Sequence, residues 1–91
     1  MAQVVITFRV MPESPDSDLK QIEKMANDAI KRFGGEVGKV EIKPFAFGLN
    51  AINIYFVMDE AKGSTEELEK EIKGMEGIAS VEVTDVRRAI G

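Results

Sequence analysis

The sequence predicts an α+β fold in which one antiparallel sheet carries two helices on one of its faces. Four segments alternate apolar with polar residues at a period of two, which is typical of half-buried strands. Two longer segments repeat apolar residues at helical spacing, and clusters of Gly, Pro, Ser and Asp separate the segments. The resulting order is strand, helix, strand, strand, helix, strand.

The first strand and the first helix lie within residues 3–34. Every second residue from Val4 to Val10 is apolar, so one face of this strand is buried until Pro12 ends it. A Ser- and Asp-rich loop follows, and Asp18 suits the positive end of a helix. The helix buries the apolar residues Leu19, Ile22, Ala26, Ala29, Ile30 and Phe33, and a pair of glycines ends it.

The second and third strands follow in close succession. Val40 and Ile42 alternate with charged residues, so the second strand has one apolar face, and it ends near Pro44. Residues 50–58 are apolar on most positions of both faces, which predicts an inner strand. Tyr55 is the one aromatic residue of this strand that could lie on the open face of the sheet.

The last helix and strand complete the pattern. Ser64 with Glu67 fits a capping box that opens a helix with Leu68 and Ile72 on its inner face. Residues 79–83 then alternate as a final strand. Two right-handed split crossovers give a ferredoxin-like fold. The expected core contains Ile6, Phe8, Ile22, Ala26, Ile30, Ile54, Phe56, Leu68, Ile72 and Val81.

Composition excludes several classes of function. The chain has 91 residues, a formal net charge of -4, no cysteine and no histidine. It therefore lacks disulfides, thiolate chemistry and the commonest general base and metal ligand. An acidic chain is poorly suited to non-specific nucleic-acid binding. No apolar run reaches the length of a membrane span and no signal-peptide pattern opens the chain. We expect one cytoplasmic domain, residues 1–91, with no covalent chemistry, metal or cofactor of its own.

Two short stretches are unusual for such a fold. In KPFAFGLN, two aromatic residues lie where strands connect, a place that is usually polar. We expect Phe45 to fold back into the core, and Phe47, beside Gly48, to be exposed as an interface anchor. The second stretch is the C-terminal pair Arg87 and Arg88 in an acidic chain, for which a solvated, frayed tail is the simplest interpretation.

The chain resembles the archaeal elongation factor 1-beta family over nearly its whole length. Three segments carry the resemblance, in the expected order and spacing: VMPESPDSDL at 10–19, PFAFGL at 44–49 and VEVTDVRR at 81–88. The chain is also similar to the C-terminal catalytic domain of the eukaryotic factor. The resemblance implies guanine-nucleotide exchange on elongation factor 1-alpha, the GTPase that delivers aminoacyl-tRNA.

The resemblance also implies roles for single residues. Phe47 would insert into a hydrophobic pocket of the GTPase, with Gly48 allowing the turn and Phe45 and Pro44 completing the binding loop. Arg88, or Arg87 if the alignment slips by one, would approach the magnesium site, where eukaryotic relatives carry lysine. The partner would be bound in its GDP-bound and nucleotide-free states, without direct contact to nucleic acid or membrane.

Two other classes of function remain open on the same fold. A small-molecule sensor module could dimerise through strand edges, and it would leave GDP release from the GTPase unchanged. A plain assembly domain would bind the GTPase without preference for its nucleotide state.

Overall fold

A computed structural model describes residues 2–89. These residues form four strands and two α-helices in the predicted order. The strands are β1 (Gln3–Pro12), β2 (Glu36–Pro44), β3 (Asn50–Asp59) and β4 (Ile78–Ala89), and the helices are α1 (Leu19–Phe33) and α2 (Glu66–Lys73). A single 3-10 turn, η1 (Glu60–Lys62), follows β3. Ile90 and Gly91, the end of the expected tail, lie outside the described residues.

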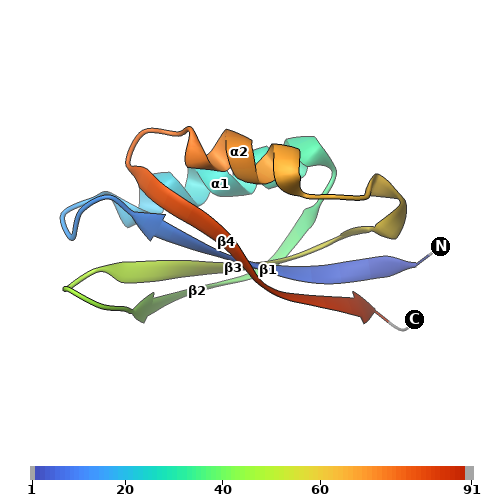
Figure 1. Cartoon of the computed structure of the whole chain (residues 1–91), viewed down its shortest axis with the longest axis horizontal. Coiled ribbons are helices and arrows are strands. Elements are labelled where there is room, and N and C mark those ends of the chain that lie inside the picture. Colours follow the sequence, from blue (N-terminus) through green and yellow to red (C-terminus); the bar gives the residue numbers. More distant parts are fainter. Residues whose placement is uncertain (1, 90–91) are drawn as a thin grey trace.

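The strands form one sheet with the order β2-β3-β1-β4, and all neighbours are antiparallel. Both helices lie on the same side of this sheet (Figure 1). β3 and β1 are the inner strands, as the dense apolar pattern of residues 50–58 predicted. The predicted ferredoxin-like arrangement is confirmed.

The core fills the space between the sheet and the helices. Phe8 of β1 and Phe56 of β3 are fully buried at its centre and meet edge to face, with ring centroids 4.9 Å apart. Nine of the ten expected core residues are buried. The exception, Val81, is partly buried and packs against the others. It lies on β4, an edge strand that has a neighbour on one side only.

The helix ends follow local chemistry. The Asp18 carboxylate accepts a hydrogen bond from the backbone N–H of Gln21 at 3.2 Å and caps α1. Gly34 ends α1 at φ 106°, in the left-handed region that favours glycine. No helix within residues 2–89 is long and apolar enough to cross a membrane.

The start of α2 corrects one prediction. Thr65, one residue after Ser64, is the N-terminal cap, and its hydroxyl donates to the Glu69 carboxylate at 2.8 Å. Ser64 instead accepts a hydrogen bond from the N–H of Glu66 at 3.1 Å. The predicted capping box with Glu67 was wrong because the adjacent hydroxyl residue took the cap position.

Strand β4 is longer than predicted. It was expected over residues 79–83, but it runs from Ile78 to Ala89 and pairs with β1 as far as Gln3. A β-bulge lies at Thr84, which has no partner between the pairs Phe8–Val83 and Thr7–Asp85. The bulge breaks the period-two alternation of apolar and polar residues. The alternation in the sequence therefore stops at the bulge, although the strand itself continues to Ala89. The two arginines therefore belong to a paired strand, which rules out a frayed tail at their positions.

Candidate functional site

The loop between β2 and β3 presents Phe47 to solvent. Phe47 is 94% exposed, in agreement with the expected exposure. Two backbone hydrogen bonds close the loop: Phe45 N–H donates to Leu49 O at 2.8 Å, and Leu49 N–H donates to Ala46 O at 3.1 Å. The loop thus holds the exposed ring at the tip of a closed turn.

The backbone of this turn is strained at Phe47. Phe47 has φ 60° and Gly48 has φ 75°, so two consecutive residues have positive φ, as in the turns that favour Asn and Gly. Phe47 is the only non-glycine residue with positive φ between residues 2 and 89. An aromatic there costs about 1 kcal/mol or more and, being exposed, contributes no core packing in return. Such a residue points to a role in binding.

Phe45 corrects another prediction, because it is not part of the core. Phe45 is 51% exposed, and the guanidinium of Arg9 lies 5.0 Å from the centroid of its ring. Alternation along β2 gives the reason: Ile42 pairs with the buried Ile52 on the helix-covered face, so Phe45, three residues later, falls on the open face. Pro44 ends β2 immediately before it and is itself exposed.

The bulge at Thr84 decides where the two arginines point. Beyond it, Arg88 pairs with Val4 and Arg87 pairs with Val5. Val4 belongs to the face of β1 that the helices cover, so Arg88 projects to that side and Arg87 to the open face. An uninterrupted alternation from Val83 would have placed them the other way round.

Arg88 is held by a bidentate ion pair. Its Nε donates to Glu60 Oε2 at 2.9 Å and its Nη2 donates to Oε1 at 2.7 Å. The hydrogen bond to Glu60 and the charge of that carboxylate raise the pKa of Arg88 above its usual value, which favours the cationic form that arginine already has. Within the described part of the chain, the Arg87 side chain forms one hydrogen bond, from Nε to Asp85 Oδ2 at 2.9 Å. Sequence reasoning missed Glu60, because a lone acid in a turn 28 residues away carries no signal.

Phe47 and Arg88 lie at opposite ends of the sheet. Figure 1 shows the β2–β3 loop at one end and the end of β4 at the other. The ten residues of β3 separate the two ends by roughly 30 Å at 3.3 Å per residue. The structure brings Pro44, Phe45, Phe47 and Gly48 together in one loop and Arg87 and Arg88 together on one strand, but it does not join the two groups.

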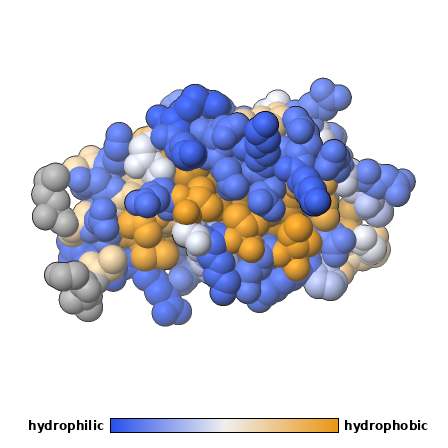
Figure 2. All heavy atoms as spheres, turned by 180° about the vertical axis from the view of Figure 1, so that it is seen from behind, coloured by the Kyte–Doolittle hydropathy of each residue, from blue (hydrophilic) through white to orange (hydrophobic). Residues whose placement is uncertain are grey.

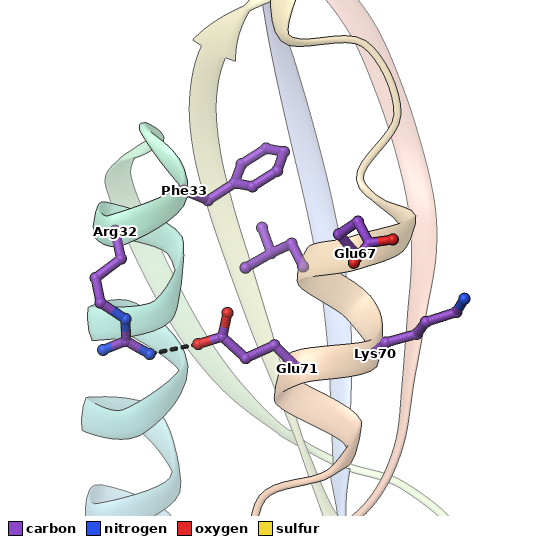
Figure 3. A pocket seen from close by; sticks show the side chains of 6 residues that line it. Arg32, Phe33, Glu67, Lys70 and Glu71 are labelled. Atoms are coloured by element: carbon purple, nitrogen blue, oxygen red, sulfur yellow. Dashed lines mark hydrogen bonds and ion pairs between the residues drawn. The ribbon is translucent and has the colours of Figure 1, made fainter.

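Of the surface recesses within the described part of the chain, those lined mainly by helix residues contain no catalytic constellation. The one between α1 and α2 is lined by Arg32, Phe33 and Leu68 and by charged residues of α2, and the Arg32–Glu71 ion pair crosses it (Figure 3). Within residues 2–89, no group of His, Cys, Asp or Glu is arranged to hold a metal ion. This recess is a solvated junction between two helices.

Tyr55 occupies the open face but is engaged by its neighbours. Its hydroxyl donates to the Glu41 carboxylate at 2.9 Å, and the Lys39 ammonium lies 5.6 Å from the ring centroid. This hydrogen bond is the main cause that lowers the pKa of Glu41 and raises the pKa of Tyr55. A ring held in this way is poorly placed to stack on a nucleic-acid base.

We expect this hydrogen bond to make stability depend on pH. Glu41 has a lowered pKa in the folded state, so its contribution is present above its ordinary pKa of 4.5 and is lost as pH falls through the folded value. Tyr55→Phe should lower the thermal midpoint by a few degrees at pH 7 and by less near pH 3. Thermal unfolding followed by circular dichroism measures both. In a Glu41→Gln background the difference should not change with pH in this range, and a change there would contradict the assignment.

Figure 2 shows the molecule from behind relative to Figure 1, and a band of apolar residues crosses the middle of this side. On the edge strand β2, Ile42 is exposed and Val40 is partly buried. Lys39, Pro44 and a bulge at Gly38 interrupt the outer edge of this strand. Lysine, proline and bulges are features that oppose edge-to-edge pairing of sheets. They weaken the alternative in which the chain dimerises through this edge.

Comparison with known proteins gives one family. Residues 5–89 match the family model described as the EF-1 guanine nucleotide exchange domain. The chain is similar to elongation factor 1-beta of Methanothermobacter thermautotrophicus, with 47% identity over 88 residues that cover 97% of this chain and 98% of that protein. It is also similar to elongation factor 1-beta of Methanobrevibacter smithii (43% over 88 residues) and of Staphylothermus marinus (37% over 89 residues), again over 97% of this chain and 98% of each protein.

Solved structures add support for the fold alone. The ACT domain from GTP pyrophosphokinase of Chlorobium tepidum has a TM-score of 0.61 at 15% identity, covering 89% of this chain and 97% of that one. The C-terminal domain of the MgtC protein from Mycobacterium tuberculosis has a TM-score of 0.64 at 11% identity, covering 97% and 88%. At these identities the shared architecture carries no functional information.

Proposed function

Because the chain belongs to the family of EF-1 guanine nucleotide exchange domains, we propose that it promotes GDP release from elongation factor 1-alpha, so that GTP can enter and aminoacyl-tRNA can bind again. The family match across residues 5–89 carries this proposal. An exchange factor acts by binding and performs no covalent step, which is consistent with a chain without histidine or cysteine. The role also implies a cytoplasmic location.

The proposed mechanism depends on charge at the end of β4. A GTPase holds GDP largely through magnesium and through backbone groups that cradle the phosphates. Arg88 would bring a permanent cation close to that magnesium and either repel it or take over its acidic ligands. The electrostatic interaction of the Arg88 charge with magnesium or with its acidic ligands is strong where water is partly excluded. The factor then binds the nucleotide-free GTPase better than the GDP-bound one. By thermodynamic linkage, GDP and the exchange factor each lower the affinity of the GTPase for the other.

Phe47 supplies the second contact in this proposal. An exposed aromatic at the tip of a closed loop is suited to enter an apolar pocket of the partner. Since Phe47 and Arg88 lie at opposite ends of the sheet, the GTPase would contact the domain along its long dimension, which extends 41 Å. Anchoring at one end would limit the orientations in which the other end meets the magnesium site.

The decisive experiment is a nucleotide-release assay. Elongation factor 1-alpha loaded with a fluorescent GDP analogue is mixed with excess GTP, with and without this protein. We expect the protein to accelerate the loss of fluorescence in proportion to its concentration. A sensor module would leave the rate unchanged, and a plain assembly domain would bind the GTPase equally well in its GDP-bound and nucleotide-free states.

A further inference from the structure

The Arg88–Glu60 pair is built into the end of the sheet. Gln3 of β1 pairs with Asp59 on one side and with Ala89 on the other, so the ends of β3 and β4 flank the same strand. Glu60 follows Asp59 directly and Arg88 precedes Ala89. The Arg88 side chain therefore reaches across the width of β1 to meet Glu60.

Glu60 is fixed in place by the turn that contains it. Its backbone N–H donates to Ala2 O at 3.0 Å, and its carbonyl accepts from Gly63 N–H at 3.1 Å. The Asp59 carboxylate caps the same turn by accepting from Ala61 N–H at 2.8 Å. The carboxylate of Glu60 thus extends from an anchored backbone and holds both donors of one guanidinium edge.

This pairing opposes the proposed mechanism of exchange, which needs the full positive charge of the Arg88 guanidinium. A guanidinium paired with a carboxylate presents a dipole in place of a full charge, and the field of a dipole falls off faster with distance. Among residues 2–89, Arg88 is the only arginine held by two hydrogen bonds to one carboxylate. Its side chain is nevertheless 67% exposed, so the pair can open without disturbing the core.

We propose that Glu60 is a positioning residue that competes with the GTPase for Arg88. In the unbound protein Glu60 neutralises and orients the guanidinium. On docking, the acidic groups of the magnesium site displace Glu60, and the freed cation then acts on the metal. This inference rests on the proposed exchange function.

The test is the effect of Glu60→Gln on GDP release. Glutamine keeps the size of the side chain but removes the negative charge that holds Arg88. Less free energy is then needed to separate the Arg88 guanidinium from residue 60 when the GTPase docks. An exposed ion pair changes an equilibrium by at most about fivefold. We therefore expect the second-order rate constant for release of the fluorescent GDP analogue to rise about two- to fivefold, with an unchanged thermal midpoint for the variant itself.

Glu71→Gln is the matched control. It removes the same charge from an ion pair of similar exposure, because the Glu71 side chain is 46% exposed and that of Glu60 is 44% exposed. Glu71 pairs with Arg32 between the helices (Figure 3), away from the end of β4. With this variant, GDP should leave the GTPase at the same rate as with the wild-type factor. That result would exclude a general effect of the net charge of the factor on GDP release.

A double-mutant cycle separates positioning from a direct effect of the Glu60 charge. The double variant, Glu60→Gln with Arg88→Ala, should promote GDP release from the GTPase no faster than Arg88→Ala alone, because the increase in rate caused by Glu60→Gln depends on Arg88. A gain that persists without Arg88, or a Glu60→Gln rate at or below wild type, would overturn the inference. If wild type itself leaves release at the spontaneous rate, the proposed function fails and the inference fails with it.

Discussion

Replacing Arg88 with alanine should slow GDP release from elongation factor 1-alpha by about 100-fold or more relative to wild type. The reason is that the variant loses the one cation that projects from the end of β4 on the helix-covered side. An ion brought near magnesium in a partly desolvated cleft interacts far more strongly than it would in water. The thermal midpoint should change little, because Arg88 is exposed and supports no core contact.

Arg87→Ala is the control for this prediction. It removes the same charge from the neighbouring position, but Arg87 projects from the open face and pairs with Asp85. Its effect on release should be small. Wild-type rates for both alanine variants would contradict the proposed mechanism.

Arg88→Lys distinguishes two ways in which Arg88 could act. If a point charge near magnesium suffices, lysine should keep much of the activity. A lysine variant as slow as alanine would indicate bidentate recognition of a carboxylate, which only the guanidinium can provide. Raising the magnesium concentration should inhibit the wild-type factor, because metal and arginine compete for one region. Stopped-flow fluorescence measures all of these rates.

Replacing Phe47 with alanine should weaken binding to nucleotide-free elongation factor 1-alpha about 30-fold, which corresponds to about 2 kcal/mol. Phe47 is 94% exposed, so removal of its ring deletes little packing in the unbound protein. The free energy of unfolding should therefore stay close to wild type. Titration calorimetry and denaturant unfolding measure the two quantities separately.

Phe47→Gly gives a sharper version of the same test. Glycine adopts positive φ without strain, so it should stabilise the fold by about 1 kcal/mol while it weakens binding as much as alanine does. Ile42→Ala is the control, since it truncates another exposed apolar residue near this end of the sheet, outside the loop. A Phe47→Ala variant that unfolds readily but binds normally would show that Phe47 is structural.

The sequence alone was sufficient for the architecture. Period-two and helical spacing of apolar residues are local properties, and they placed every strand and both α-helices in the correct order. They also identified the centre of the core, including Phe8 and Phe56, because burial follows from the face on which a residue lies. Likewise, Phe47 beside Gly48 indicated an exposed loop tip before any tertiary contact was known. Its role as an anchor stays a prediction.

Only the tertiary structure decided the arrangement at the end of β4. The β-bulge at Thr84 shifts the alternation by one residue, and a bulge depends on pairing with β1, which leaves no mark in the local pattern. That shift turns Arg88 toward Glu60 and Arg87 toward the open face. The ion pair joins residues 28 positions apart, and such a contact arises only when β3 and β4 end on either side of the same strand.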